Sequence, residues 1–200
     1  QMAVDSVASR AHGYGMPGTQ IVNNRWGSAW NQYLAKQEYI IISKEARRMS
    51  ALFESFKNLS YRDMAQYLGK DTATGVQYLV NQGIVDPDRI GAWVWSGGGY
   101  FTGLMLTKNA HLFDVGVSVA PVMDFRLYDS IYTERSMGLP QDNKSGYDST
   151  SVLSYVDRFK GKLLVIHGTG DDNVHSQNLT WLVEEFIKYD KQLDLSLIHI

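Results

Sequence analysis

The segment Ile90–Tyr100 constrains the fold of this chain more strongly than any other stretch. Its first part, Ile90–Trp95, is an apolar run of strand length, and Ser96 follows directly with three consecutive glycines behind it. Glycine tolerates backbone angles that other residues avoid, so glycines after a strand indicate that the chain reverses within a few residues. We therefore expect a buried strand that turns sharply into a helix, with Ser96 at the turn.

A serine at this kind of turn presents its hydroxyl above the carboxyl edge of a parallel sheet, as the nucleophile elbow of α/β-hydrolases does. Ser96 is accordingly the candidate nucleophile, although Val94 breaks the usual Gly-x-Ser-x-Gly pattern. An ordinary tight turn is an equally open interpretation. A nucleotide-binding loop is a third, because a G-x-G-x-x-x-G spacing begins at Gly97, but the nearest acidic residue, Asp114, opens the next strand rather than closing it.

Other apolar runs alternate between strand and helix patterns, which is typical of a parallel sheet with covering helices. Residues 1–13 show no periodicity and are compatible with disorder. Gly83 fits the glycine that ends a helix. Besides the strand before Ser96, strands are expected at residues 39–43, 113–119 and 163–167. Helices are expected at residues 26–36, 71–81, 98–108 and 179–189.

Composition excludes several classes of function. The 200 residues suit one domain with a full core, and 19 basic against 21 acidic side chains give a net charge of −2, which offers no footprint for nucleic acid or an anionic membrane. The sequence contains no apolar run of about 18 residues, which is the length needed to span a membrane. The chain contains no Cys, which excludes disulfides, a Cys nucleophile and thiolate metal ligands but does not fix the compartment. We expect no metal and no cofactor.

A second polar loop follows the apolar run Leu163–His167. It contains the adjacent carboxylates Asp171 and Asp172, and in α/β-hydrolases the acid of the catalytic triad follows the serine along the chain. Ligands of α/β sheets bind beyond the carboxyl ends of the strands, where this loop should lie. Asp171 is therefore the candidate acid. Capping of the next helix is the alternative role, which Asp172 or Asn173 suits better.

Four longer segments carry a family resemblance. They are Tyr14–Gln20, Trp95–Tyr100, Tyr128–Arg135 and Ile166–His175, and together they resemble the dipeptidyl peptidase IV family of prolyl oligopeptidase-like serine peptidases. The likeness runs from residue 14 to residue 194, except around residues 44–56. It implies the α/β-hydrolase fold, in which a mostly parallel sheet carries helices on both faces, here in an incomplete form.

The resemblance implies a role for each residue of the expected active site. Ser96 would attack the scissile carbonyl, Asp171 would orient the base histidine, and the Tyr14 hydroxyl and the Gly97 N–H would stabilise the oxyanion. Asn173 would hold a substrate carbonyl. The resemblance also implies an apolar pocket for a penultimate proline, which would be lined by Val122, Phe125, Tyr128, Tyr132 and Val174. For the tyrosines of this pocket, plain core packing is the alternative role.

The chain departs from the family pattern at three places. Members of the family usually have Gly-Trp-Ser-Tyr-Gly-Gly-Tyr at the elbow, whereas this chain has Val94 two residues before the serine and Gly97 directly after it. Val94 adds a branched side chain at a crowded turn, and Gly97 removes a tyrosine from the pocket. The Asp/Asn-Arg-Gly-Thr-Gly stretch of the family is not recognisable at residues 43–48. A catalytically dead α/β-hydrolase interaction module is therefore the rival interpretation.

No histidine of this chain is assigned as the catalytic base. The family places it about thirty residues after the acid, which from Asp171 falls just past Ile200. His199 lies in the final six residues, Leu-Ser-Leu-Ile-His-Ile, which match one reading frame of a common transposon sequencing adapter. We therefore divide the chain into a partial peptidase domain, residues 1–194, and a non-native tail, residues 195–200. Genomic sequence that continues into the tail would refute this division.

The resemblance also implies a function for a longer parent protein. The parent would be a serine exopeptidase that releases Xaa-Pro or Xaa-Ala dipeptides from peptide N-termini through an acyl-enzyme, and the fragment itself should be inactive without the base histidine. The partner of the parent protein would be a peptide substrate with a penultimate proline or alanine. An upstream β-propeller, a homodimer and a periplasmic or extracellular location are further expectations for the parent.

Overall fold

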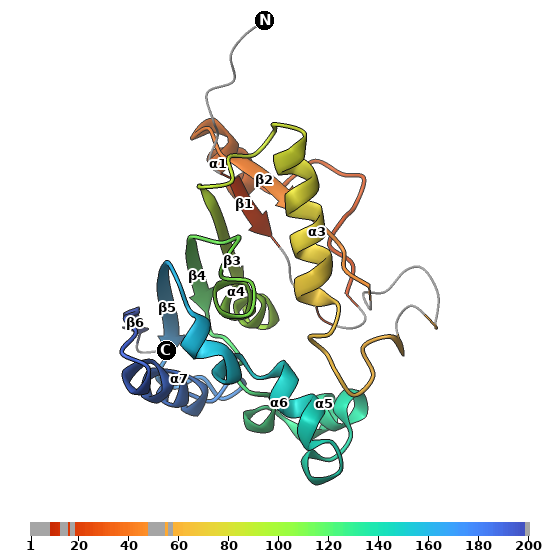
Figure 1. Ribbon diagram of the computed structural model, residues 1–200, viewed down its shortest axis with the longest axis vertical. Helices are drawn as coiled ribbons and strands as arrows, with labels where there is room; N and C mark the ends of the chain where they lie inside the picture. Colours follow the sequence, from red (N-terminus) through yellow and green to blue (C-terminus); the bar gives the residue numbers. More distant parts are fainter. Residues whose placement is uncertain (1–8, 13–15, 17–18, 48–54, 56–57, 199–200) are drawn as a thin grey trace, which may run out of the picture.

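A parallel sheet of six strands runs through the residues that the computed structural model describes, which are 9–12, 16, 19–47, 55 and 58–198 (Figure 1). The strands follow the order β2-β1-β3-β4-β5-β6, and every neighbouring pair among them is parallel. This arrangement confirms the predicted α/β fold. The strands are β1 (Ser9–His12), β2 (Ile40–Ser43), β3 (Ile90–Trp95), β4 (Val115–Val119), β5 (Lys162–Gly168) and β6 (Asp194–Ile198).

Strands β3 and β4 end level with one another, and β5 continues past them from Ile166 to Gly168. In the register of the sheet, Trp95 of β3 pairs with Val119 of β4, and Val119 pairs with Ile166 of β5. Figure 1 shows α5 (Ser130–Met137) and α6 (Lys144–Thr150) gathered beyond the ends of these strands. The loops that follow the three strands therefore leave the sheet at one edge.

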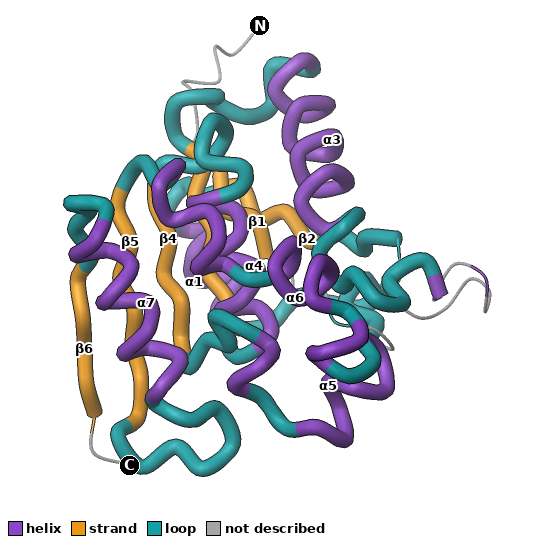
Figure 2. The backbone as a smooth tube through the Cα atoms, turned by 60° about the horizontal axis from the view of Figure 1, so that its bottom comes forward, coloured by secondary structure: helices purple, strands orange, loops and turns teal. Residues whose placement is uncertain are grey.

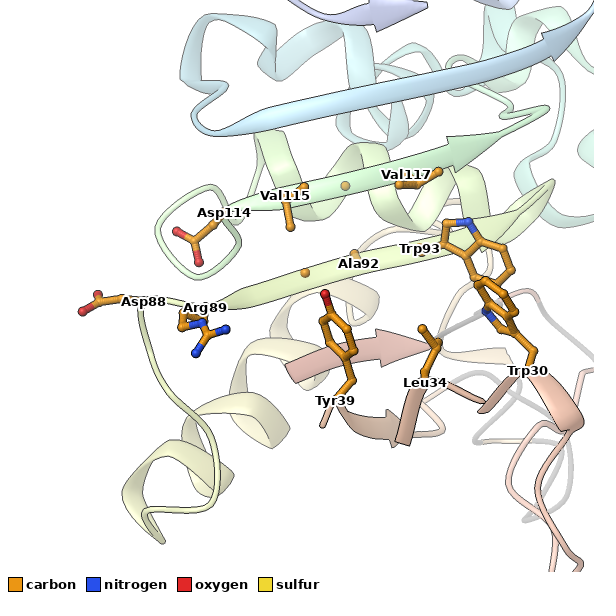
Figure 3. A pocket seen from close by; sticks show the side chains of 12 residues that line it. Trp30, Leu34, Tyr39, Asp88, Arg89, Ala92, Trp93, Asp114, Val115 and Val117 are labelled. Carbon is orange, nitrogen blue, oxygen red and sulfur yellow. The ribbon is translucent and has the colours of Figure 1, made fainter. Parts of the chain in front are cut away.

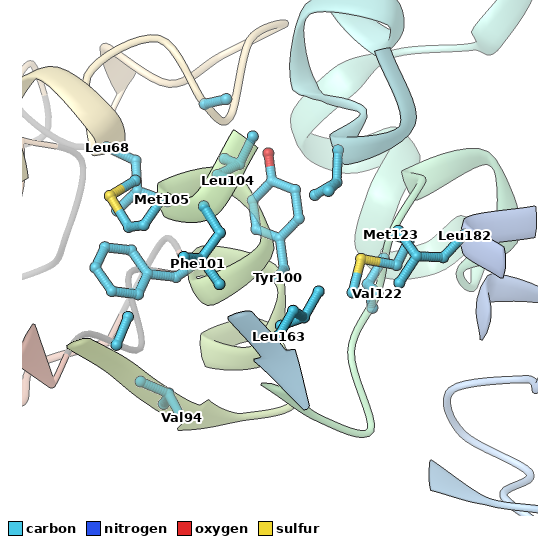
Figure 4. Close-up of a cluster of buried hydrophobic side chains, with 14 of the residues drawn as sticks. Leu68, Val94, Tyr100, Phe101, Leu104, Met105, Val122, Met123, Leu163 and Leu182 are labelled. Carbon is cyan, nitrogen blue, oxygen red and sulfur yellow. The ribbon is translucent and has the colours of Figure 1, made fainter. Parts of the chain in front are cut away.

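Helix α4 (Gly97–Thr107) forms the centre of the hydrophobic core. All of its residues are buried, as expected for a helix that is apolar all round. Figure 4 shows its Tyr100 and Phe101 among side chains from β3, β5 and the loop after β4. Val94, which was expected to crowd the elbow, is 3% exposed and lies in the same core, so its branched side chain has a place there.

The remaining helices flank the sheet and its carboxyl edge. In Figure 2, α7 lies along β5 and β6. Gly83 has a φ of 69° and lies just past the end of the helix that was predicted at residues 71–81. Helices α5 and α6 had no prediction because their polar sequences lack a clear apolar stripe.

None of the helices within the described residues is long and apolar enough to cross a lipid bilayer. The further bounds are α1 (Ala29–Lys36), α3 (Leu68–Asn81) and α7 (Gln177–Lys188), with 3-10 turns η1 (Phe125–Leu127), η2 (Pro140–Asp142) and η3 (Val152–Arg158).

The face of the sheet opposite α4 is more open. Successive strand residues point to opposite faces, so Trp93 points away from the side on which Ala92 and Val94 are buried. Trp30 of α1 packs against Trp93, with ring centroids 5.7 Å apart. Figure 3 shows the apolar cavity beside this pair, which has a volume of about 520 Å³ and is lined by none of the predicted site residues. Its walls include Leu34, Tyr39, Val115 and Val117.

Strand β1 corrects the prediction for the N-terminal residues. The expectation of disorder at residues 1–13 is wrong for residues 9–12, which form a strand between β2 and β3. This segment has no apolar alternation, and hydrogen-bonding partners on both sides supply what its local sequence lacks. The rest of residues 1–13 lies outside the described residues.

Strand β6 lies at the other end of the sheet and includes part of the predicted tail. It pairs with β5 from Asp194 opposite Leu164 to Ile198 opposite Gly168. Pairing at a sheet edge uses backbone groups, which any non-proline residue offers. The division of the chain at Asp194 therefore stays a prediction that the genomic sequence tests.

Candidate active site

The turn between β3 and α4 holds Ser96 in a strained backbone conformation. Its φ of 56° and ψ of −119° lie in a region that residues with a side chain rarely occupy. The Ser96 N–H donates to the Val119 carbonyl (2.8 Å), and the Ser96 carbonyl accepts the Tyr100 N–H (3.0 Å). The sharp strand-to-helix turn expected from the sequence is therefore present, with Ser96 at the start of α4.

The glycines after Ser96 allow α4 to approach neighbouring segments closely. A Cβ atom at Gly99 would lie 2.9 Å from the Val119 carbonyl oxygen, and one at Gly97 would lie 2.5 Å from Met16 Cγ. Both glycines therefore face protein atoms at short range. In a nucleotide-binding loop the missing Cβ atoms leave room for a pyrophosphate, whereas here protein atoms occupy the space beside both glycines.

A cavity of about 160 Å³ opens beside Ser96. It brings the candidate nucleophile together with four of the five implied pocket residues. Tyr128 and Tyr132 meet edge to face, with ring centroids 5.6 Å apart; both are half-buried, pack against the core and line the cavity. The residues around the cavity are Met16, Thr19, Ser96, Gly97, Val122, Phe125, Tyr128 and Tyr132.

The cavity wall that follows β4 is tied to α7 through Asn178. This side chain is fully buried, and its carbonyl oxygen accepts the N–H groups of Met123 (2.9 Å) and Asp124 (3.3 Å). Its amide nitrogen donates to the carbonyls of Leu127 (3.4 Å) and His175 (3.2 Å). One buried amide therefore connects the pocket segment with the loop after β5.

The loop after β5 holds Asp171 by hydrogen bonds from its own residues. Asp171 Oδ1 accepts the N–H groups of Asn173 (3.0 Å) and Val174 (2.9 Å). The buried His167 has its Nε2 2.8 Å from the Val174 carbonyl and 3.7 Å from Asp171 Oδ2. Within the described part of the chain, no hydrogen bond ends on Oδ2, so this oxygen can accept an imidazole N–H.

A hydrogen bond joins the cavity to this loop. The Tyr128 hydroxyl donates to Asn173 Oδ1 (3.2 Å), and the Asn173 N–H in turn donates to Asp171. Because its oxygen faces Tyr128, the Asn173 amide keeps its NH₂ group for another acceptor, as a role toward a substrate carbonyl requires. The cavity of Ser96 and the Asp171 carboxylate are thus connected through Tyr128 and Asn173 at one edge of the sheet.

Neither His167 nor His175 lines the Ser96 cavity. His167 is 1% exposed and directed at the Val174 carbonyl. His175 accepts the Gln177 N–H at Nδ1 (3.2 Å) just before α7. No histidine side chain that the structure describes lines the cavity, so the base stays unassigned.

Several sequence predictions for the site have a different outcome. Tyr14 lies outside the described residues. Val174 is 1% exposed in the core and does not line the cavity. Helix α7 has Ser176 at its N-cap, so neither Asp172 nor Asn173 caps it, and Asp171 caps a turn of its own loop instead.

Two residues of the cavity wall, Met16 and Thr19, had no prediction. They belong to the glycine- and proline-rich loop that follows Tyr14, and they reach the serine only through the tertiary fold. The available signal was Gly97. A glycine beside a nucleophile leaves a side-chain space that another segment has to fill, because protein interiors are closely packed.

The stretch after β2, where the family pattern is not recognisable, is anchored to α3 by an ion pair. Arg47 donates to Asp71 through Nε (3.1 Å), Nη2 (2.6 Å) and its backbone N–H (2.9 Å). Burial raises the pKa of the Asp71 carboxyl, but the hydrogen bonds from Arg47 outweigh burial and hold that pKa below its usual value. This segment therefore has a fixed position despite its divergent sequence.

The chain is similar in sequence to known peptidases. Residues 26–199 match the prolyl oligopeptidase family. The prolyl endopeptidase FAP of Bos taurus is 39% identical over 179 residues, and the probable dipeptidyl peptidase 4 of Aspergillus flavus is 39% identical over 178 residues. These matches cover 87% and 86% of this chain but 23% of each relative, so the chain spans a minor part of their length.

Two solved structures share the fold of this chain. Dipeptidyl peptidase 4 of Porphyromonas gingivalis has a TM-score of 0.92 and 33% identity, over 96% of this chain and 27% of that one. A putative dipeptidyl aminopeptidase IV of Bacteroides ovatus has a TM-score of 0.93 and 30% identity, over 97% of this chain and 28% of that one. With its α/β-hydrolase fold and its match over most of the sequence, the chain belongs to the prolyl oligopeptidase family of serine peptidases.

Proposed function

We propose that this chain carries the nucleophile and the acid of a serine peptidase that releases dipeptides from peptide N-termini. The main support is the Ser96 turn, in which a strained serine opens a buried helix beside a small apolar cavity. A nucleophile elbow has this arrangement, and it serves an acyl-enzyme mechanism. Asp171 supplies the carboxylate from a loop at the same edge of the sheet.

In the proposed reaction, Ser96 Oγ attacks the carbonyl carbon of the second substrate residue while a histidine takes the serine proton. Negative charge then develops on the carbonyl oxygen. The Gly97 N–H can stabilise this charge, because the first N–H groups of a helix have no intrahelical acceptor and Gly97 opens α4. The Tyr14 hydroxyl is proposed as the second donor, on the resemblance. The protonated histidine returns its proton to the leaving amine, and water then hydrolyses the acyl-enzyme.

The cavity supports a preference for proline or alanine at the penultimate position. Its walls are aromatic and aliphatic, and its volume of about 160 Å³ suits a compact apolar side chain. A proline ring is rigid, apolar and lacks an N–H. We propose that this ring enters the cavity while the Asn173 NH₂ group donates to a substrate carbonyl.

The base histidine is proposed to come from a part of the full-length protein beyond residue 200. Asp171 Oδ2 would accept its N–H, since Oδ1 is already bound by two backbone N–H groups. An upstream β-propeller, a homodimer, and a periplasmic or extracellular location belong to the same proposal. The isolated residues 1–200 should then show little or no activity.

Hydrolysis of a Gly-Pro anilide by the full-length protein tests the proposal. We expect turnover that disappears in Ser96→Ala and is absent from the isolated chain. The rival, a catalytically dead interaction module, predicts no turnover by the full-length protein and no labelling of Ser96 by a fluorophosphonate.

A further inference from the structure

Met16 takes the place that a side chain at residue 97 would fill. A Cβ atom on Gly97 would lie 2.5 Å from Met16 Cγ, 3.1 Å from Sδ and 3.4 Å from Cε. Met16 is 5% exposed and lines the cavity of Ser96. The wall directly beside the serine is therefore a thioether from a segment about eighty residues earlier in the chain.

The segment that carries Met16 is held by contacts of its own. Thr19 donates its N–H (3.2 Å) and its hydroxyl (2.6 Å) to the Met16 carbonyl. Further along, the N–H groups of Ile21 (2.9 Å) and Val22 (3.0 Å) donate to Glu45 Oε1. The backbone that follows Met16 is therefore held at Thr19, Ile21 and Val22.

We propose that Met16 is a specificity-determining residue, which sets the size of the side chain that the cavity accepts next to the scissile bond. The inference rests on the proposed peptidase function and adds a wall to it. Methionine is unbranched, flexible and polarizable, so it fills irregular space without a fixed shape. While Met16 is present it restricts the cavity to compact side chains, and its truncation should open the cavity to longer unbranched ones.

The kinetic test compares two anilide substrates of the full-length protein, Gly-Pro and Gly-norleucine. In Met16→Ala, the ratio of kcat/KM for Gly-norleucine to that for Gly-Pro should rise by about tenfold, because small changes of apolar volume in a pocket have effects of this order. Met16→Val should shift the ratio in the same direction by less. Met64→Ala removes the same atoms at a fully buried methionine outside the cavity, and it should leave the ratio at the wild-type value.

The outcomes separate this inference from the function on which it rests. An unchanged ratio in Met16→Ala and Met16→Val, with Gly-Pro still hydrolysed, would overturn the role of Met16 and leave the peptidase function standing. No hydrolysis by the wild type, together with no fluorophosphonate label on Ser96, would overturn both.

A second test, of the contact between Met16 and Gly97, needs no catalysis. Gly97→Ala forces a Cβ atom against Met16 and should lower the melting temperature of the full-length protein. In a Met16→Ala background the same change should lower it by less, because the clashing atoms are gone. Thermal unfolding of the wild type, both single variants and the double variant measures the difference. An equal decrease in both backgrounds would contradict the contact.

Discussion

The Ser96 turn and the Asp171 loop hold their side chains by different means. Ser96 has a φ of 56°, and its turn depends on a hydrogen bond to Val119 of the next strand and on the close approach of Gly99 to that same residue. Asp171 has no positive φ, and its two hydrogen bonds come from residues two and three positions further along. The serine is thus positioned by tertiary packing, and the acid by its own loop.

This difference shows where each half of the site is vulnerable. Changes that alter packing between α4 and β4 should displace the serine even when they lie outside the cavity. Changes at the acid should act through its charge, because the loop supplies its own hydrogen bonds. Variants in each region therefore test whether the serine depends on tertiary packing and the acid on its own loop.

The largest effect is expected from Asp171→Asn in the full-length protein. The amide oxygen can still accept the two loop N–H groups, so the fold should persist, but the charge that we propose stabilises the protonated base is lost. By analogy with other serine peptidases, kcat should fall by about 10⁴-fold. Hydrolysis of the Gly-Pro anilide measures this loss, and circular dichroism checks the fold.

Asp172→Asn is the matched control. Asp172 is exposed, is adjacent in sequence and undergoes the same change of charge. We expect kcat within about threefold of the wild type, since an exposed charge that is not part of the triad has a screened effect. A larger loss in Asp172→Asn than in Asp171→Asn would transfer the role of acid to Asp172.

On the serine side, Gly99→Val should lower the free energy of unfolding by about 3 kcal/mol. The first added carbon would lie 2.9 Å from the Val119 carbonyl oxygen, which is backbone and cannot rotate away. Gly75→Ala is the control, because the nearest atom to its Cβ is 3.9 Å away and the residue lies within a helix. That change should leave stability unaltered or raise it by about 0.5 kcal/mol. Urea unfolding measures both, and equal effects would contradict the packing argument.

Asn178→Ala tests the amide that connects the two regions. It leaves the N–H groups of Met123 and Asp124 and the carbonyls of Leu127 and His175 without this partner, and we expect a loss of about 2 kcal/mol in the free energy of unfolding. The change should also raise KM, because the pocket wall and the Asp171 loop lose their shared anchor. A stability loss without any change in KM would show that the amide supports the core but not the site.

The smallest effect concerns the two ion pairs of Asp148, one with Arg126 and one with Lys144. Asp148 accepts hydrogen bonds from Lys144 Nζ and Arg126 Nη2, each 2.5 Å long, and these partners, Lys144 first, hold its pKa below the usual value. A lowered pKa in the folded state adds stability above the usual carboxyl pKa of about 4, and this stability is lost as the pH falls through the lowered value. Because these pairs are largely exposed, Asp148→Asn should reduce stability by only about 0.5 kcal/mol at pH 7.

Urea unfolding of the wild type and Asp148→Asn at pH 7 and pH 3 measures this contribution. The difference between the two proteins should shrink at the lower pH. A difference that grows on acidification would reverse the sign that we assign to the Asp148 pKa.

The sequence predicted those parts of the fold whose signals are local. The apolar run and the glycines around Ser96 indicated β3 and α4, and the run before Gly168 with the amphipathic stretch behind it indicated β5 and α7. Strand β1 was missed because its pairing partners, and not its own residues, make it a strand. Helices α5 and α6 were missed because polar segments carry little periodicity.

The candidate site shows the same division. Ser96 and Asp171 follow from chain order and loop position, and four pocket residues follow from the resemblance. Met16 could not be predicted in this way, because only the tertiary fold brings it next to Gly97. Local sequence reports which groups have suitable chemistry, whereas the tertiary fold decides which of them share one cavity.

The central claim is that Ser96 and Asp171 act on one substrate at one edge of the sheet. A crystal structure of the full-length protein after reaction with a fluorophosphonate tests it most directly. We predict phosphorus bound to Ser96 Oγ, a phosphonyl oxygen within hydrogen-bonding distance of the Gly97 N–H, and an imidazole between the adduct and Asp171 Oδ2. An adduct on another serine, or an imidazole held by a carboxylate other than that of Asp171, would contradict the account.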